Sequence, residues 1–141
     1  MKKIFCGFAV VISATIVLMS VQSSAQVKKG KERVLQTKNW MAGVNLPHCS
    51  ALGKMLKEGL SDDKAWSEAV QHAEVLNESG HVLMADSRCP DKVWADAATQ
   101  LRDGSAAMLK ALNARSSSDA KAAFDGQVLK SCSGCHEKHK K

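Results

Sequence analysis

The C-terminal segment 119–136 reads DAKAAFDGQVLKSCSGCH and organises the interpretation of the whole chain. Ser118 or Asp119 can cap the start of a helix there. Small and apolar residues then recur on one face of that helix: Ala120, Ala123, Phe124, Val128 and Cys132. The segment therefore predicts a helix that ends in the motif Cys132-Ser133-Gly134-Cys135-His136.

Three further helices are expected upstream of this segment. The first runs from about residue 31 to 57, and Pro47 should kink or split it because proline lacks an N–H and clashes with the preceding turn. The second follows the capping residues 61–63 and continues to about Met84, with Gly80 weakening its last turns. The third begins with Pro90 in its first turn and ends before the serines at 116–118.

The number of elements and the short connections between them predict the fold class. We expect an all-α protein, an antiparallel up-down-up-down four-helix bundle, with its chemistry on the last helix. An irregular helical protein with the same four elements is the alternative. The chain has 141 residues, no Tyr and two Pro, and it lacks alternating strand patterns.

The motif at 132–136 is the part of the sequence that indicates chemistry. C-x-x-C-H is typical of covalent c-type haem attachment, in which both thiols form thioethers with one porphyrin edge. Cys132 and Cys135 are then the attachment points, and His136 is the proximal ligand of the haem iron. We expect one covalent haem c as the cofactor.

The same cysteines allow two other interpretations. A zinc site would use Cys132, Cys135, His136 and His139, but zinc ligands usually come as two separated pairs. A simple redox disulfide between Cys132 and Cys135 would be expected in a βαβ context, which this helical pattern does not provide.

The first 25 residues have the pattern of a cleavable signal peptide. Lys2 and Lys3 precede an apolar run over 4–21, and small residues at Ser23 and Ala25 suit cleavage before Gln26. We therefore expect a periplasmic protein with a signal peptide at 1–25 and a single-haem bundle domain at 26–141. An uncleaved membrane anchor is the alternative.

The charge balance limits the classes of partner. The formal net charge is +6, and removal of Lys2 and Lys3 would lower it to +4. Basic and aromatic residues are not interleaved, so nucleic acid is not expected as a partner. We also expect no membrane contact after signal cleavage. A homodimer is possible on the sequence alone.

In its C-terminal motif and its four expected helices, the chain resembles the class II c-type cytochromes, the cytochrome c-prime superfamily. Residues 40–43 and 51–57 resemble the first helix of the low-spin branch, which carries a distal methionine where Met41 stands. The arginine that the family places shortly before this position is replaced by Thr37 and Lys38, and Pro47 is also unusual. The segment 83–91 resembles exported members.

Bundle geometry selects residues that should lie level with the haem. The end of the last helix should meet the start of the first helix, the end of the second and the start of the third. That level holds Met41, His81, Leu83, Met84, Val93 and Trp94. Met41 is the first choice for the distal iron ligand, with Met84 and His81 as alternatives, and Trp94 is expected to pack near the porphyrin.

Cys49 and Cys89 remain after the motif is assigned. In an oxidising compartment they could form a disulfide between the first helix and the loop before the third. Two separate buried thiols are the alternative.

These residues predict a single-electron carrier and not an enzyme. Methionine and histidine ligation would keep the iron six-coordinate in both oxidation states. If Met41 only packs, a five-coordinate iron would instead bind a small gas such as nitric oxide or carbon monoxide. A peroxidase would need a polar distal residue, for which only His81 is a candidate. A collar of lysines, Lys130, Lys138, Lys140 and Lys141, suggests an acidic redox partner protein.

Overall fold

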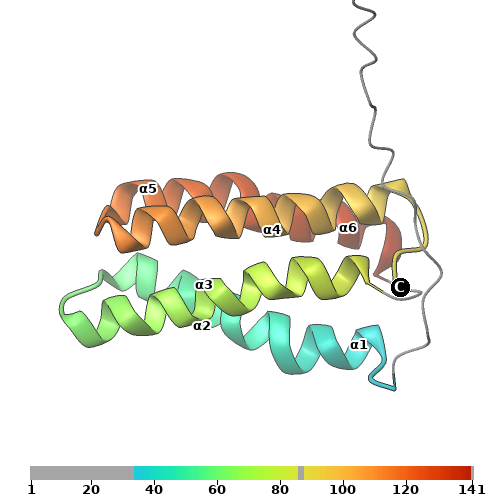
Figure 1. Ribbon diagram of the computed structural model, residues 1–141, viewed down its shortest axis with the longest axis horizontal. Coiled ribbons are helices and arrows are strands. Elements are labelled where there is room, and N and C mark those ends of the chain that lie inside the picture. Colours follow the sequence, from blue (N-terminus) through green and yellow to red (C-terminus); the bar gives the residue numbers. More distant parts are fainter. Residues whose placement is uncertain (1–33, 86–87, 141) are drawn as a thin grey trace, which may run out of the picture.

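A computed structural model describes residues 34–85 and 88–140, and the predicted signal peptide and Lys141 lie outside that part of the chain. The described residues are helical, with no strand among them, and they form four helices packed together. Figure 1 shows two layers, with α4, α5 and α6 on one side and α2 and α3 on the other. No helix in this part of the chain is both long and apolar enough to cross a bilayer.

The first helix is interrupted by a π turn directly before Pro47. It consists of α1 (Thr37–Trp40), the π turn η1 (Met41–Asn45) and α2 (Leu46–Glu58). Pro47 has no N–H to donate and its ring would clash with the carbonyl of Gly43 in a regular α-helix. The wider turn before it accommodates the ring without a gap between the helical pieces. The predicted disturbance at Pro47 is confirmed, and it takes this local form.

The second helix, α3 (Asp63–Met84), begins and ends close to the predicted positions. Gly59 ends α2 with a φ of 95°, a conformation that favours glycine. Asp62 is the N-cap of α3, and its carboxylate accepts a hydrogen bond from the Ala65 N–H at 2.8 Å. At its other end, Ser79 is fully buried and accepts a hydrogen bond from Trp40 Nε1 at 3.3 Å.

The third helix, α4 (Lys92–Asn113), starts two residues after Pro90. The expectation that Pro90 lies in the first turn is wrong, because Asp91 is the N-cap and its carboxylate accepts a hydrogen bond from Trp94 N at 3.0 Å. The side-chain cap sets the start of this helix, and Pro90 belongs to the loop before it.

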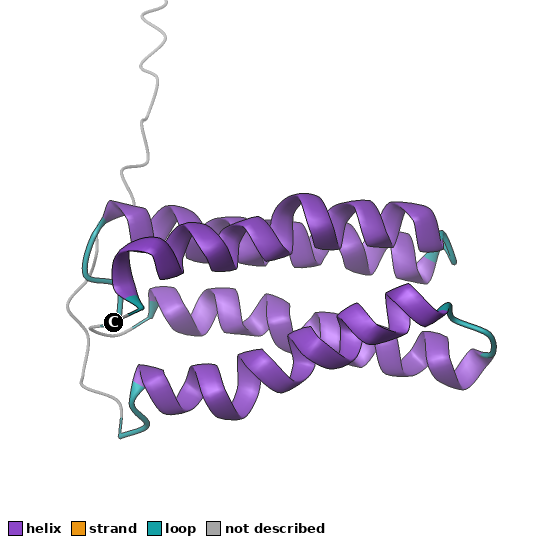
Figure 2. Ribbon diagram, turned by 180° about the vertical axis from the view of Figure 1, so that it is seen from behind, coloured by secondary structure: helices purple, strands orange, loops and turns teal. Residues whose placement is uncertain are grey.

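The fourth helix contains a second π turn. It consists of α5 (Ser117–Ala123), η2 (Phe124–Val128) and α6 (Leu129–His139), and Figure 2 shows its pieces running together without a loop. The N-cap is Ser116 and not Ser118 or Asp119. Ser116 Oγ donates to the Asp119 carboxylate at 2.7 Å, so Asp119 lies in the first turn, where a negative charge stabilises a helix.

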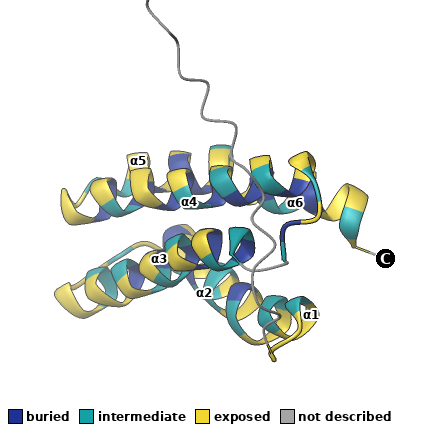
Figure 3. Cartoon of the chain, turned by 45° about the vertical axis from the view of Figure 1, so that its right-hand side comes forward, coloured by how far each residue is buried: buried dark blue, intermediate teal, exposed yellow. Residues whose placement is uncertain are grey.

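The core lies between the two layers and includes side chains from all four helices. Leu52, Leu76, Met108, Leu112 and Val128 are among its fully buried members. Figure 3 shows that buried residues face inward and exposed ones outward along each helix.

Glycines allow close approaches between helices in this core, among them those at Gly80 and Gly53. At Gly80, the Cβ of a larger residue would lie 2.7 Å from Arg102 Cβ. At Gly53, it would lie 3.2 Å from the Phe124 ring. Gly80 therefore serves helix packing between α3 and α4, although glycine is a poor helix former.

Candidate functional site

The C-x-x-C-H motif lies entirely within α6, at the end of the bundle where the first helix also begins (Figure 1). Cys132 is half-buried, Cys135 is 9% exposed, and His136 is exposed to solvent. Residues three apart on a helix are neighbours on its surface, so the two thiols share a side of α6. His136 follows directly and has an open approach.

Cys132 lies beside Cys49 of α2, and the two thiols are within hydrogen-bonding reach of each other. The hydrogen bond from Cys49 lowers the pKa of Cys132 to about 7, against the opposing effect of burial. The pKa of Cys49 is raised, first by its hydrogen bond with Cys132 and then by burial. The interaction between the two thiols therefore favours the thiolate form at Cys132 and the protonated form at Cys49.

The other two thiols are enclosed by the protein. Burial raises the pKa of Cys135, and the charges of Cys132 and Asp91 raise it further. Cys89 is buried, its pKa is also raised by burial, and its Sγ donates to the Asp91 carbonyl at 3.6 Å. Cys49 and Cys89 are both free thiols, so the structure contains no disulfide between them. Cys49 faces Cys132 instead.

Asp91 connects the start of α4 to the last turn of α6. Its Oδ2 lies 2.8 Å from Lys138 Nζ, and its Oδ1 lies 3.4 Å from His139 Nε2. The hydrogen bond from Lys138 and then the one from Trp94 N lower the pKa of Asp91 to about 2. The carboxylate thus caps one helix and anchors another with a single charge, and it fixes the helix end that carries the motif.

Trp94 is buried beside this anchor. Its Nε1 donates to the Leu83 carbonyl at 2.8 Å, and its ring meets the His139 ring edge-on with centroids 5.2 Å apart. This places Trp94 at the C-terminal end of α6, next to the motif-bearing turn. Leu83 is buried here too, whereas Val93 is 40% exposed.

The candidate distal residues differ in their surroundings. Met41 is half-buried against the core and lies in the π turn η1, where its Sδ accepts a hydrogen bond from Asn45 Nδ2 at 3.4 Å. Met84 is half-buried as well, and its Sδ accepts from Thr99 Oγ1 at 3.7 Å. His81 is exposed.

Asn45 adds a feature that a bound group could use. Its side chain is buried, at 8% exposure, and its Oδ1 has no hydrogen-bond partner. Unpartnered buried polar atoms are rare in native proteins. Asn45 is one helical turn from Cys49, on the side toward Met41, so it faces the same end of the bundle as the motif.

A pair of histidines joins α2 to α3 away from the motif. His48 Nδ1 and His72 Nδ1 are 2.9 Å apart, and the rings meet edge-on. Burial lowers the pKa of His72, and the neighbouring His48 lowers it further. One neutral ring donates to the other, which satisfies both nitrogens in this geometry.

A covalent haem and a zinc ion make different demands on the side chains around the motif. No group of three or more His, Cys, Asp or Glu side chains within residues 34–85 and 88–140 is arranged to hold a metal ion. His139, needed for the zinc alternative, has its Nε2 3.4 Å from Asp91 Oδ1 and its ring edge-on to Trp94. Two thiols and a following exposed histidine on one helix are the groups that a c-type haem requires.

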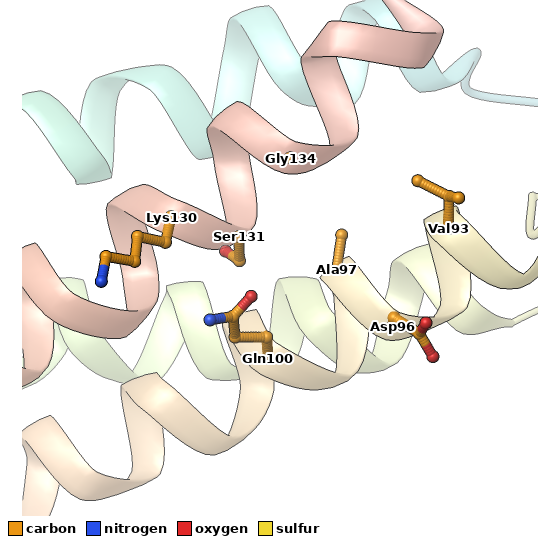
Figure 4. Close-up of a pocket in the computed structure, with 7 residues that line it drawn as sticks. All are labelled: Val93, Asp96, Ala97, Gln100, Lys130, Ser131 and Gly134. Atoms are coloured by element: carbon orange, nitrogen blue, oxygen red, sulfur yellow. The ribbon is translucent and has the colours of Figure 1, made fainter.

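A shallow depression lies between α4 and α6, and Figure 4 shows the side chains around it. It is lined by Val93, Asp96, Ala97, Gln100, Lys130, Ser131 and Gly134. Nothing lies within 4 Å of the position that a Cβ would take at Gly134, so the motif has open space on this side.

Comparison with known proteins found no match: no family model, no curated protein and no solved structure matches the chain. The sequence had singled out the motif, Met41 and Trp94. It had not indicated the roles of Asp91, Asn45 or the His48–His72 pair. An aspartate directly before a helix is a signal that could have identified Asp91 as a cap.

Proposed function

We propose that the chain is a periplasmic single-electron carrier with one covalently bound haem c, built as an antiparallel up-down-up-down four-helix bundle with the haem on its last helix. The observation that supports this most is the C-x-x-C-H motif on one continuous helix, with His136 exposed directly after two thiols on one side. The contacts of Trp94 with Leu83 and His139, and of Trp40 with Ser79, support the bundle level predicted for the haem.

In this proposal each residue of the site has a separate task. Cys132 and Cys135 hold the porphyrin through thioethers, and His136 is the proximal ligand. Met41 is the distal ligand, and Trp94 packs near the porphyrin. When bound, the haem supplies one-electron exchange at its iron.

The surroundings of the motif suit an electron carrier because they hold it rigidly. Asp91 pins the last turn of α6 to the start of α4 through Lys138. Trp94 packs behind the same turn. A site on a packed helix reorganises little, which favours a group that changes charge without changing its ligands.

A five-coordinate, gas-binding protein is the second candidate function. The hydrogen bond from Asn45 Nδ2 occupies a lone pair of Met41 Sδ, which favours a methionine that packs instead of ligating. In that case the distal side would take up a small gas such as nitric oxide or carbon monoxide, and Asn45 would be the nearest buried polar side chain on that helix.

Acid–acetone extraction of the purified chain tests the attachment. Haem should stay with the polypeptide, because thioether bonds survive the treatment. The double variant Cys132→Ala, Cys135→Ala should lose it, whereas Cys89→Ala should retain it. A wild-type chain that releases its haem, or that contains zinc instead, would refute the proposal.

An absorption spectrum in both oxidation states separates the two candidate functions. A low-spin ferric spectrum with the weak near-red band of a sulfur–iron bond supports the electron carrier. A high-spin spectrum with ready carbon monoxide binding supports the gas-binding protein.

A further inference from the structure

Two histidines from neighbouring helices direct the same ring nitrogen at each other. His48 Nδ1 of α2 and His72 Nδ1 of α3 are 2.9 Å apart, and the two rings are inclined at 69°. Both side chains are half-buried, so solvent reaches them. We propose that this pair binds a divalent transition-metal ion, Cu²⁺ or Ni²⁺, between α2 and α3. Neither histidine belongs to the haem motif, so this inference does not depend on the proposed function.

The distance between the two nitrogens suits two ligands at a right angle. Imidazole nitrogens lie about 2.0–2.1 Å from a bound metal ion of this kind, so two of them are about 2.9 Å apart at a right angle and about 3.3–3.4 Å apart at the tetrahedral angle. The observed 2.9 Å matches neighbouring positions of a tetragonal site. That geometry is typical of Cu²⁺ and Ni²⁺ with nitrogen and oxygen ligands. The nitrogens need not move apart to admit the ion, and the rings need only turn their lone pairs toward it.

The protonation states of the pair are compatible with a bound metal. Burial lowers the pKa of His72, His48 lowers it further and Glu68 raises it, so with this net lowering the ring is neutral at pH 7. In the metal-free chain one Nδ1 carries a proton and donates to the other. When an ion binds, that proton moves to Nε2 of the same ring and both Nδ1 lone pairs reach the ion. The exchange therefore releases no net proton.

The packing of the two helices holds the rings in place. α2 packs against α3. Leu52, one turn after His48, and Leu76, one turn after His72, are both buried in the core. Each histidine is therefore attached to a helix that the core fixes. Ligands on packed helices keep their geometry better than ligands on loops.

Water would supply the remaining ligands of the ion. The described part of the chain offers no third His, Cys, Asp or Glu that would complete a cluster around it. Glu68 lies four residues before His72, on the same side of α3. Its carboxylate is exposed and forms only a 3.7 Å ion pair with Lys64, so its charge favours a dication nearby. The site therefore has two protein ligands and open positions toward solvent.

Thermal unfolding of the purified full-length chain tests the site with Ni²⁺, because Cu²⁺ would oxidise free thiols such as Cys49. At a Ni²⁺ concentration about 100 times the Kd, the unfolding midpoint should rise by roughly 10 °C. EDTA should reverse the rise, and Mg²⁺, which prefers oxygen ligands, should cause none. No rise with Ni²⁺, or an equal rise with Mg²⁺, would leave the histidines as a hydrogen-bonded pair and overturn the inference.

Matched variants identify the ligands by isothermal titration calorimetry. His48→Gln and His72→Gln should each weaken Ni²⁺ binding about tenfold or more, because even the loss of an outer-shell partner costs about 10–100-fold. His81→Gln removes an exposed histidine of the same helix, and Cys49→Ser removes the neighbouring thiol. Both should keep the affinity. If either control weakens binding as much as His48→Gln and His72→Gln do, the ion binds elsewhere and the inference is wrong.

Discussion

The Asp91 carboxylate and the Lys138 ammonium group, 2.8 Å apart, join the residue that caps α4 to the last turn of α6. The two residues belong to helices that meet only through folding, and Lys138 lies two residues after His136. The end of the motif-bearing helix is therefore held by a charge on its neighbour.

Asp91→Asn should remove this attachment and make the chain less dependent on pH in acid. Asparagine is as good an N-cap as aspartate, so the substitution removes the charge and keeps the cap. The folded pKa of Asp91, about 2, is below its usual value of 3.8. Its contribution is therefore present above pH 3.8 and is lost as the pH falls toward 2. Urea midpoints measured from pH 2 to pH 7 should show this loss in the wild type and not in Asp91→Asn.

Asp96→Asn is the control for that experiment. Asp96 pairs with Lys92 one turn away on the exposed face of α4, where an ion pair contributes little. An equal effect of the two substitutions would show that Asp91 is only another surface charge.

Gly80→Ala should destabilise the fold by about 1–3 kcal/mol, the range expected for overpacking. The new Cβ would lie 2.7 Å from Arg102 Cβ and 2.8 Å from Arg102 N. The backbone of α4 would have to move, which outweighs the better helix propensity of alanine. Gly126→Ala has nothing within 4 Å and should unfold at the same urea concentration as the wild type or higher. Equal midpoints for Gly80→Ala and Gly126→Ala would contradict the close packing of α3 on α4.

The His48–His72 contact should make stability fall as the pH drops below about 6.5. The folded pKa of His72 is lowered by burial and by His48, so the unfolded chain binds more protons than the folded chain in this window. Stability then rises with pH between the lowered folded pKa and the unfolded value. His72→Gln should flatten the change in urea midpoint between pH 7 and pH 5. His81→Gln, an exposed position on the same helix, should leave that slope as it is.

Met41→Ala should remove the near-red band of the ferric haem protein and open the iron to carbon monoxide, if Met41 is the distal ligand. Met84→Ala is the matched comparison, because Met84 is also half-buried and its Sδ also accepts a hydrogen bond. Loss of the band in Met84→Ala alone would transfer the role to Met84. Asn45→Ala should shift the band without abolishing it, because the asparagine donates to the Met41 sulfur.

Replacement of Lys130 and Lys140 by Glu should slow electron exchange with an acidic partner protein at low salt, with an unchanged haem spectrum. Lys138 is left out of this test because it is paired with Asp91, so its charge is partly neutralised. Lys57→Glu with Lys110→Glu changes the charge equally, near the C-terminal ends of α2 and α4. Stopped-flow reduction at two ionic strengths measures the rates of electron exchange. Equal slowing by the two double substitutions would show that the lysines near the motif have no special role.

The helices could be predicted closely because their signals are local. Gly59, the Asp62 cap and the apolar stripe placed α3 within about a residue of its observed bounds. Contacts between helices were harder to predict, because they depend on how far each helix is rotated about its own axis. The π turns change that rotation, and neither was predicted. Pro47 signalled a disturbance without giving its form, and no signal in the sequence brings Cys49 to Cys132.

The π turn at Met41–Asn45 also decides what a one-residue deletion in the first helix would do. A π turn holds one more residue than an α turn, so the loss of a single residue there would close it to a regular turn and leave the preceding residues in nearly the same orientation relative to α2. Trp40 would then stay beside Ser79, its partner at 3.3 Å. The cost of the deletion would fall on Pro47 instead, because its ring would clash with a carbonyl of the preceding regular turn.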